Sequence, residues 1–278
     1  MAANLVKAGH EVAVWNRTAG KEVEGARSAA TPADAATGAE VVWMCVSDTK
    51  AVEAVLFGAN GVEQALAAGM IVADSSTISP SATRRFAERV KARGVDYVDA
   101  PMTGSKIAAE AGSLIFMVGG DEAALARLQP LFQAMGKQVF HMGETSKGQA
   151  TKLVMNLQIA LIYEGFAEAL TLAAKLGVDV EKLLPLIQAS MVRSGVVDYK
   201  APFILKRDFS PNFPLRLMLK DIRLALDAAK ESRVRLPGLE AVEEVYDVAA
   251  EEGQQDLDYA ATLTLLEKWA GVEVKGGA

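Results

Sequence analysis

The first half of the chain alternates short apolar segments with longer amphipathic ones. Six of the apolar segments predict strands, at residues 11–15, 41–46, 70–74, 95–99, 114–118 and 138–141. Helical periodicity between them is clearest at residues 80–93 and 121–135. Nearly continuous apolar strands that alternate with helices indicate a parallel sheet covered on both faces. We therefore predict a doubly wound, Rossmann-like domain over residues 1–143.

The hydrophobic period changes near Gly143, and no strand is predicted after it. Residues 147–176 form one long helical pattern with apolar side chains every three or four positions, and Gly177 is suited to end it. Further helices are predicted at 180–191, 215–232, 237–252 and 259–269. Residues 144–278 are thus predicted to form an all-helical domain for substrate binding and oligomerisation. Its apolar character leads us to expect a homodimer or homotetramer.

The chain begins within a helical pattern, at residues 1–7, which Gly9 closes before the strand at 11–15. In a dinucleotide-binding Rossmann unit, a central strand and a glycine-rich turn precede this helix. Removing that strand would cost about 1–3 kcal/mol for each buried backbone group left unpaired. We therefore expect Met1 to be an internal methionine, preceded by about 15 to 20 residues that supply the strand and the glycine loop. The alternative is a different fold that starts with a helix.

Composition and charge argue against several classes of protein. A net charge of −6 provides no basic excess for binding nucleic acid. The longest stretch without a charged residue, 153–163, is too short to cross a bilayer, so no membrane segment is expected. The single cysteine, Cys45, cannot form an internal disulfide, and two histidines alone do not supply a zinc site. We expect a cytoplasmic protein without a metal.

The residues that follow the strand at 11–15 bear on the choice of cofactor. In Rossmann domains an acidic residue here binds the ribose hydroxyls of NAD, whereas a cation accommodates the 2′-phosphate of NADP. This chain has Asn16, Arg17 and Thr18 and no acid. Arg17 offers a forked donor to phosphate, and its two neighbours add neutral hydrogen-bonding groups. The sequence therefore predicts NADP(H), unless Arg17 is an ordinary surface residue of a turn.

Three further segments carry candidate chemistry. They are VDAPMTGSK at 98–106, GQATKLVMN at 148–156, and FPL at 213–215 followed by KDIRLA at 220–225. Together they resemble the β-hydroxyacid dehydrogenases, a family that includes 3-hydroxyisobutyrate dehydrogenases and glyoxylate/succinic semialdehyde reductases. The resemblance extends over essentially the whole chain. In the family, the helix matching residues 1–7 directly follows a glycine-rich loop, which agrees with the expected missing strand.

Lys152 is the candidate for the reacting group. It is a polar exception on the apolar face of the long helix, and Asn156 lies one turn further on the same side. Burial disfavours a charged amine and lowers its pKa, which suits a lysine to proton transfer near neutrality. The family has its catalytic lysine at this position, and we expect Asn156 to orient it or to hold substrate. The alternative is an amphipathic lysine whose ammonium group reaches solvent.

Thr103, Gly104 and Ser105 follow a predicted strand at the sheet edge where open α/β sheets bind ligands. Gly104 lets the backbone approach closely, and hydroxyls and neighbouring amides can bind a carboxylate. The resemblance implies that this segment, usually Ser-Gly-Gly, grips the substrate acid. The departure to Thr103 and to Ser105-Lys106 is similar to the glyoxylate/succinic semialdehyde reductases. A polar turn without further role is the alternative.

Further cofactor contacts rest on the resemblance. Thr77 follows the strand at 70–74 and is implied to lie at the nicotinamide end of the cofactor. Val46 and Ser47 end another strand and are implied to pass beneath the dinucleotide. The alternative for the first segment is a simple helix cap, which explains Ser79 better than Thr77.

In the second domain the resemblance points to one helix and the segment before it. Lys220 is implied to reach the cofactor, Asp221 the substrate, and Phe213 to line the pocket. A Lys-Asp pair on a helix is otherwise usually a solvated surface pair.

These residues favour an NADPH-dependent reductase of a short aldehyde or keto acid, such as glyoxylate or succinic semialdehyde. An NAD(P)-dependent 3-hydroxyisobutyrate dehydrogenase, running in the oxidative direction, is the runner-up. A non-catalytic oligomeric binding protein without the cofactor loop is an alternative of another class. Such a scaffold has no need of the five residues Thr103, Lys152, Asn156, Lys220 and Asp221 together.

Overall fold

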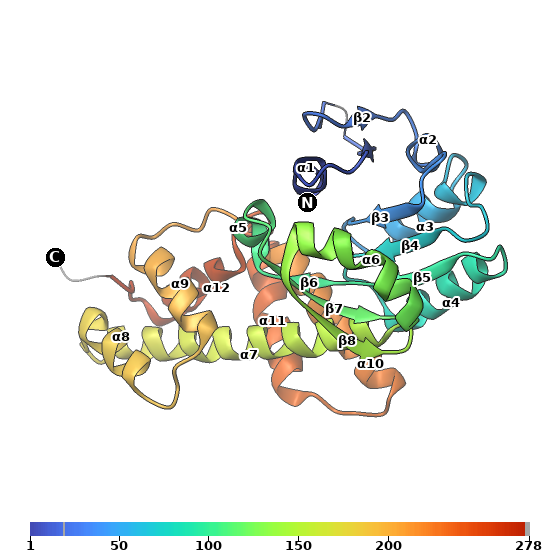
Figure 1. Cartoon of the computed structure of the whole chain (residues 1–278). Helices are drawn as coiled ribbons and strands as arrows, with labels where there is room; N and C mark the ends of the chain where they lie inside the picture. The colour runs from blue at the N-terminus through green and yellow to red at the C-terminus, as the bar shows by residue number, and fades with distance from the viewer. Residues whose placement is uncertain (19, 276–278) are drawn as a thin grey trace. The chain divides into compact units, whose positions relative to one another are not determined.

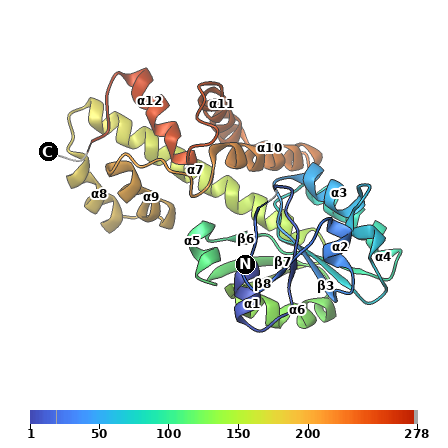
Figure 2. The same ribbon diagram turned by 90° about the horizontal axis from the view of Figure 1, so that it is seen from above.

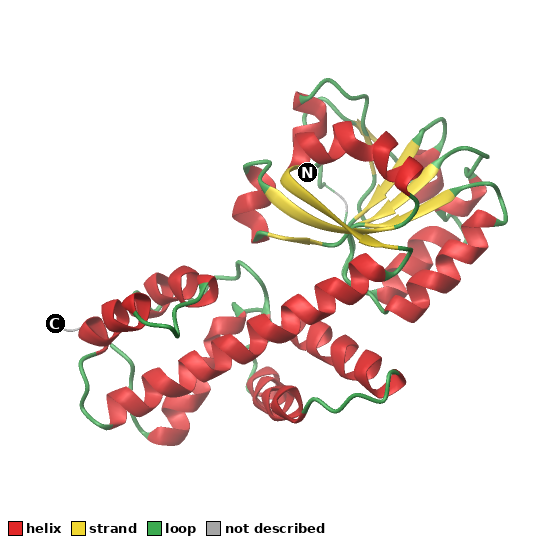
Figure 3. Cartoon of the chain, turned by 60° about the horizontal axis from the view of Figure 1, so that its bottom comes forward, coloured by secondary structure: helices red, strands yellow, loops and turns green. Residues whose placement is uncertain are grey.

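The structure, a computed structural model, describes residues 1–18 and 20–275 (Figure 1). The chain divides into two compact units, Met1–Lys152 and Leu153–Ala278. The first holds the sheets, whereas the second is built from helices (Figure 3). The division falls inside helix α7 (Lys147–Lys175), later than the predicted change near Gly143. The reason is that the first turns of α7 are hydrogen-bonded to the sheet of the first unit.

The main sheet has the order β3-β4-β5-β7-β6, with β8 paired to β7. Strands β3 (Val41–Met44), β4 (Ile71–Asp74) and β5 (Asp96–Asp99) are parallel, as predicted. The predicted Rossmann-like α/β fold is confirmed, but its sheet is mixed, because β7 runs antiparallel to β5 and β6 and parallel to β8. These last strands are β6 (Met102–Thr103), β7 (Leu114–Gly119) and β8 (Gly136–Gly143).

The lengths of the connections account for these strand directions. Between β6 and β7 lies only the six-residue helix α5 (Ser105–Glu110), which is too short for a crossover between parallel strands. Between β7 and β8 lies the 14-residue helix α6 (Glu122–Met135), which is long enough for one.

Helices cover both faces of this sheet (Figure 2). Along β4, Val72 packs into the cluster that includes helices α3 (Thr49–Phe57) and α4 (Pro80–Lys91). Its neighbours Ile71 and Ala73 pack into the cluster beneath α6. The strand is therefore buried on both sides, which is why it reads as a continuous apolar run.

The N-terminal elements belong to the same unit. Helix α1 (Ala2–Lys7) is tied to α5 by a hydrogen bond from Asn4 Nδ2 to the carbonyl of Ala109, at 3.0 Å. Strands β1 (Ala13–Val14) and β2 (Arg27–Ser28) form a separate parallel pair, followed by the short helix α2 (Pro32–Ala36). The 3₁₀ turn η1 (Val62–Gln64) comes later, after α3.

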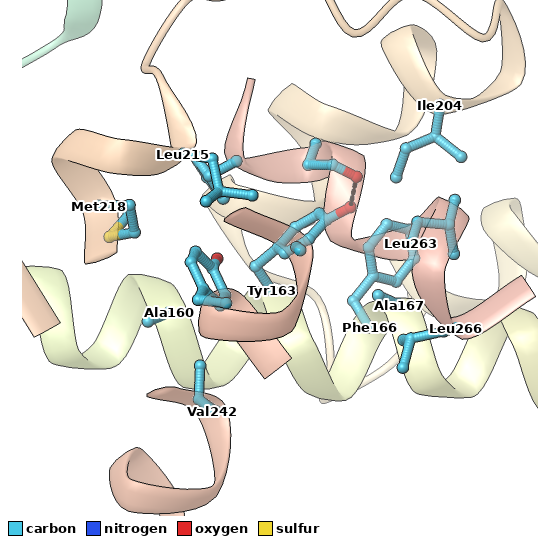
Figure 4. Packing of buried hydrophobic residues seen from close by; sticks show 14 of the residues in the cluster. Ala160, Tyr163, Phe166, Ala167, Ile204, Leu215, Met218, Val242, Leu263 and Leu266 are labelled. Carbon is cyan, nitrogen blue, oxygen red and sulfur yellow. Dashed lines mark hydrogen bonds between the residues drawn. The ribbon is translucent and has the colours of Figure 1, made fainter. Parts of the chain in front are cut away.

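The second unit packs its helices around α7. Tyr163 of α7 is fully buried, and its hydroxyl donates to the carbonyl of Ala260 at 2.6 Å (Figure 4). Among the described helices only α7 is long and apolar enough to cross a membrane, but its buried side chains form the core of this unit. The other elements are α8 (Val180–Ala189), α9 (Gly195–Leu205), α10 (Leu215–Glu231), α11 (Pro237–Glu251), η2 (Tyr259–Ala261) and α12 (Thr262–Ala270).

Candidate active site

Two buried carboxylates lie at the carboxyl ends of adjacent parallel strands. Asp74 ends β4 and Asp99 ends β5, and the two residues pair in register. Asp74 accepts hydrogen bonds from the Tyr97 hydroxyl at 2.8 Å and from the Ser76 amide at 2.9 Å. Burial and the nearby Asp74 carboxylate raise the pKa of Tyr97 well above its usual value, so the phenol remains a donor. The loop after β4 is thereby fixed to the sheet.

Asp99 joins the start of α7 to the end of β5. Its carboxylate accepts from the amide of Ser146 at 2.6 Å and from that of Gln149 at 2.8 Å. These are amides at a helix N-terminus, which have no partner within the helix and which favour a negative charge. Burial nevertheless raises the pKa of Asp99 to about 6, against the lowering effect of the two amides.

Lys152 follows on α7 less than one turn after Gln149. Its side chain is only 8% exposed, whereas a lysine that extends its ammonium group to solvent would be far more exposed. The structure thus gives Lys152 the buried setting on which its predicted role depends. The role itself remains a prediction.

The segment predicted to bind the substrate acid has an unusual backbone. Gly104 has φ +132°, and a Cβ there would lie 2.5 Å from the Cβ of Ala108. Ser105 begins α5 with φ +60°, a left-handed conformation that costs an L-residue about 1–2 kcal/mol. Thr103 is half-buried at the end of β6, and the two residues after it are exposed. Strain of this kind is concentrated at ligand-binding segments.

The loops predicted to contact the cofactor are joined to each other. The amide of Val46, after β3, donates to Ser76 Oγ at 2.9 Å, and Ser76 directly precedes Thr77. Ser47 donates from its hydroxyl to Asp48, the residue that caps α3. The ends of β3 and β4 therefore present one continuous polar edge.

Asn16, Arg17 and Thr18 follow β1 and are exposed. Asn16 Nδ2 donates to the carbonyl of Thr18 at 2.8 Å, which closes this turn. Within residues 1–18 and 20–275, the guanidinium of Arg17 forms no ion pair. A cation, an amide and a hydroxyl on one exposed turn are a donor set that suits a phosphate group.

In the second unit, three predicted residues come together. Asn156 of α7 donates from Nδ2 to Asp221 Oδ2 of α10 at 2.5 Å, and both side chains are buried. Lys220 Nζ lies 2.8 Å from the other carboxylate oxygen of Asp221. A solvated surface pair is therefore the wrong interpretation of Lys220 and Asp221. Asn156 also lies one helical turn beyond Lys152, on the same helix.

Phe213 lies in the segment before α10, which a buried ion pair holds in place. Asp258 accepts from the amides of Asn212 and Phe213, each at 3.0 Å, and pairs with Lys200 Nζ at 2.6 Å. The Phe213 ring packs edge-to-face on Tyr259, with 6.2 Å between ring centroids. The supporting pair was not predicted, because 58 residues separate its members and neither has a local motif.

Glu164 is a further buried group that the sequence patterns did not single out. It is 4% exposed on α7, and among the described residues neither carboxylate oxygen has a hydrogen-bond partner. Burial, together with Glu168, raises the pKa of Glu164 to about 7. The described residues include no cluster of three or more His, Cys, Asp or Glu side chains suited to hold a metal ion.

Comparison with known proteins assigns both halves of the chain. Residues 1–143 match the profile of the NAD binding domain of 6-phosphogluconate dehydrogenase. Residues 146–266 match a profile described as NAD-binding in NADP-dependent 3-hydroxyisobutyrate dehydrogenase.

Individual relatives agree over nearly the full length. The 2-hydroxy-3-oxopropionate reductase of Escherichia coli is 36% identical, over 97% of this chain and 94% of that protein. The chloroplastic glyoxylate/succinic semialdehyde reductase 2 of Arabidopsis thaliana is 32% identical, over 96% of this chain and 76% of that protein. A solved 3-hydroxyisobutyrate dehydrogenase of Mycobacterium tuberculosis has a TM-score of 0.86 and 30% identity, covering 95% of this chain and 94% of that one. The chain therefore belongs to the β-hydroxyacid dehydrogenase family, nicotinamide-dependent oxidoreductases that act on hydroxyacids.

Proposed function

We propose that this protein reduces a short aldehyde or keto acid, such as glyoxylate or succinic semialdehyde, to the hydroxyacid with NADPH. The observation that carries the proposal is the buried Lys152, one helical turn before an Asn156 that Asp221 holds in place. The names of the relatives support the substrate class, since 2-hydroxy-3-oxopropionate reductase and the glyoxylate/succinic semialdehyde reductases are reductases of small oxo acids.

The side chains divide the work of one carbonyl reduction. The nicotinamide cofactor, when bound, supplies the hydride to the carbonyl carbon. Lys152 gives a proton from Nζ to the carbonyl oxygen as negative charge develops there, which completes the C–H and O–H bonds of the alcohol. The low exposure of Lys152 limits competition from water for that proton. Asn156 donates a hydrogen bond from Nδ2 to Asp221, and its Oδ1 would accept one from the product hydroxyl.

The segment Thr103–Gly104–Ser105 would anchor the substrate carboxylate through its hydroxyls and backbone amides. Gly104 and Ser105 are exposed, so an anion can reach the backbone amides of this segment. Phe213 would supply an apolar wall, and its amide-held segment keeps it in place.

The cofactor preference rests on the turn after β1. Arg17, Asn16 and Thr18 offer a cation and neutral donors and no carboxylate, which favours the 2′-phosphate of NADP over a free ribose hydroxyl. Thr77, Val46, Ser47 and Lys220 complete the proposed cofactor contacts. The lone Cys45 is consistent with action in the cytoplasm, where thiols stay reduced.

The test is loss of NADPH absorbance across a panel of glyoxylate, succinic semialdehyde and 2-hydroxy-3-oxopropionate. The runner-up is assayed in reverse, with 3-hydroxyisobutyrate and either NAD or NADP. Lys152→Met should lower kcat by about 10²–10⁴-fold, the usual contribution of a positioned acid. Lys147→Met, at an exposed position in the first turn of the same helix, is the matched control. The proposal fails if no acid in the panel is turned over, or if Lys152→Met behaves like the control.

A further inference from the structure

Gln149 is a fully buried side chain on the first turn of α7 that lies outside the predicted site residues. Its side-chain amide forms two hydrogen bonds with the loop after β4. Nε2 donates to the carbonyl of Ser76 at 2.6 Å, and Oε1 accepts from the amide of Ile78 at 3.0 Å. These two backbone groups flank a single residue, Thr77. One side chain thereby holds both peptide groups on either side of the proposed cofactor contact.

The backbone of Gln149 is held just as firmly as its side chain. The backbone amide of Gln149 donates to Asp99 Oδ2, and the backbone amide of Ser146 donates to Asp99 Oδ1. The preceding Gly148 lies so close to β5 and β7 that a Cβ would be 2.8 Å from Asp99 Oδ2 and 2.5 Å from the Met117 carbonyl. The start of α7 therefore has little freedom to shift against the ends of these strands.

We propose that Gln149 is a positioning residue that fixes the position of the Thr77 loop, residues 75–79, relative to Lys152. Lys152 follows Gln149 by three residues, which corresponds to about 4.5 Å along the helix axis. Because Asp99 holds the start of α7, loss of the two side-chain bonds of Gln149 would let the loop after β4 shift relative to Lys152, while the helix itself stays in place. The inference rests on the proposed function, because it assigns the proton to Lys152 and the cofactor contact to Thr77.

A positioning role and a merely structural role predict different kinetics. If Gln149 only satisfied buried backbone groups, its loss would reduce the amount of folded protein and leave the kinetics of each folded molecule unchanged. If it fixes the loop relative to Lys152, the folded variant should bind the substrate acid normally through the Thr103 segment and transfer the proton poorly. A misplacement of about 1 Å can cost on the order of 100-fold in rate.

The experiment compares Gln149→Met with Gln133→Met, the same change at an exposed position of α6 in the same unit. Methionine preserves the length of the glutamine side chain and removes both hydrogen bonds. We expect kcat to fall by about 10- to 100-fold while KM for the aldehyde acid stays within about threefold. Melting temperature, measured on both variants, reports the amount of structural damage.

Amide hydrogen exchange provides a readout that does not depend on turnover. In Gln149→Met the Ile78 amide loses its acceptor and should exchange faster, whereas the amide of residue 149 keeps its acceptor, Asp99, and should not. If the wild-type protein turned over no acid, the proposed function would fail, and exchange at Ile78 would still decide whether Gln149 holds this loop. The inference is overturned if Gln149→Met has the same kcat as Gln133→Met, or if its fall in activity is fully explained by the fraction of unfolded protein. Unchanged hydrogen exchange at the Ile78 amide would overturn it as well.

Discussion

Asp221 and Lys220 are neighbours on α10, yet their side chains differ in exposure, at 2% and 22%. Asp221 bonds to Asn156, 65 residues away in the sequence, and also pairs with Lys220. A buried carboxylate is stable only when its oxygens have such partners. At the residue scale, the burial of Asp221 is therefore what distinguishes this Lys-Asp pair from the many that lie on helix surfaces.

Asp221→Asn tests this arrangement at nearly constant volume. The substitution removes the negative charge that holds both Lys220 and the amide of Asn156, so we expect kcat/KM to fall by roughly tenfold or more. Steady-state kinetics measure the effect. Asp227→Asn, at an exposed position of the same helix, should leave kcat/KM unchanged. Equal kcat/KM values in the two variants would show that Asp221 has no role in catalysis or substrate binding.

Arg17 is the residue on which the proposed preference for NADPH rests. Arg17→Ala removes the only cation of the turn at 16–18, so the KM for NADPH should rise by about tenfold or more, whereas that for NADH should change little. The measurement is initial rate against each cofactor. Arg85→Ala removes an exposed arginine from α4 and serves for comparison. A parallel rise for both cofactors would contradict recognition of the 2′-phosphate.

At the scale of elements, α7 contributes to both units. Its first turns hold Gln149 and Lys152 in the first unit, and its remaining turns form the core of the second. Glu164 is buried in that core, where neither of its oxygens has a hydrogen-bond partner among the described residues. A carboxylate in this setting destabilises the helical unit whenever it is charged.

The stability of the second unit should therefore depend on pH through Glu164. Its pKa in the folded protein is raised from 4.5 to about 7, so its protonated form favours folding, and that contribution is lost as pH rises through about 7. Glu164→Gln removes the titration and should be more stable than wild type at pH 8, with the difference shrinking towards pH 5. Each pKa unit corresponds to about 1.4 kcal/mol.

Thermal unfolding at pH 5 and pH 8 measures this difference. Glu244→Gln, at an exposed position of α11, should show no such dependence. A gap between wild type and Glu164→Gln that is the same at both pH values would show that Glu164 does not titrate in this range.

At the scale of the whole molecule, the helical unit exposes apolar side chains that a soluble surface seldom groups together. Leu172 is 60% exposed and Trp269 is 57% exposed, and both line an apolar hollow of about 380 Å³ between α7 and α12. Burying such side chains favours association, at about 25 cal/mol for each Å² of apolar surface. These side chains support the expectation of a homodimer or homotetramer.

Leu172→Asp tests that expectation. A charge placed at this hollow should weaken self-association, so sedimentation velocity should show a smaller species than for wild type at the same concentration. Ala169→Asp, about one turn nearer the start of α7 and also exposed, is the control. It shows whether a negative charge elsewhere on this helix is enough to weaken self-association. A monomeric wild type would refute the expectation directly.

Local patterns predicted most of the main sheet and the longest helices but missed several other elements. The apolar runs located β3, β4, β5, β7 and β8 to within a few residues. Strands β4, β5 and β7 are largely buried and so need nearly continuous apolar sequence, whereas most of β8 is exposed. The two-residue strands β2 and β6 are too short to show a period. Helix α9 was also missed, since Pro202 lies inside it and its apolar residues form no clear stripe.

The candidate site divides along the same line. Lys152 and Asn156 were named from their place on the apolar face of a helix, whereas Lys220 and Asp221 were named from the resemblance to the family. Neither signal identified Gln149, Lys200 or Asp258, since a buried glutamine or an ion pair spanning 58 residues has no signature within one helix.

The sequence by itself determined the order of most elements, the change from a sheet to helices, and the residue types of the candidate site. Period and composition report what each residue meets within a turn or a strand. Only the tertiary structure decided which polar groups lose water and which partners replace it. Contacts between segments far apart in the chain bury Glu164, join Asn156 to Asp221, and bond Gln149 to the Thr77 loop.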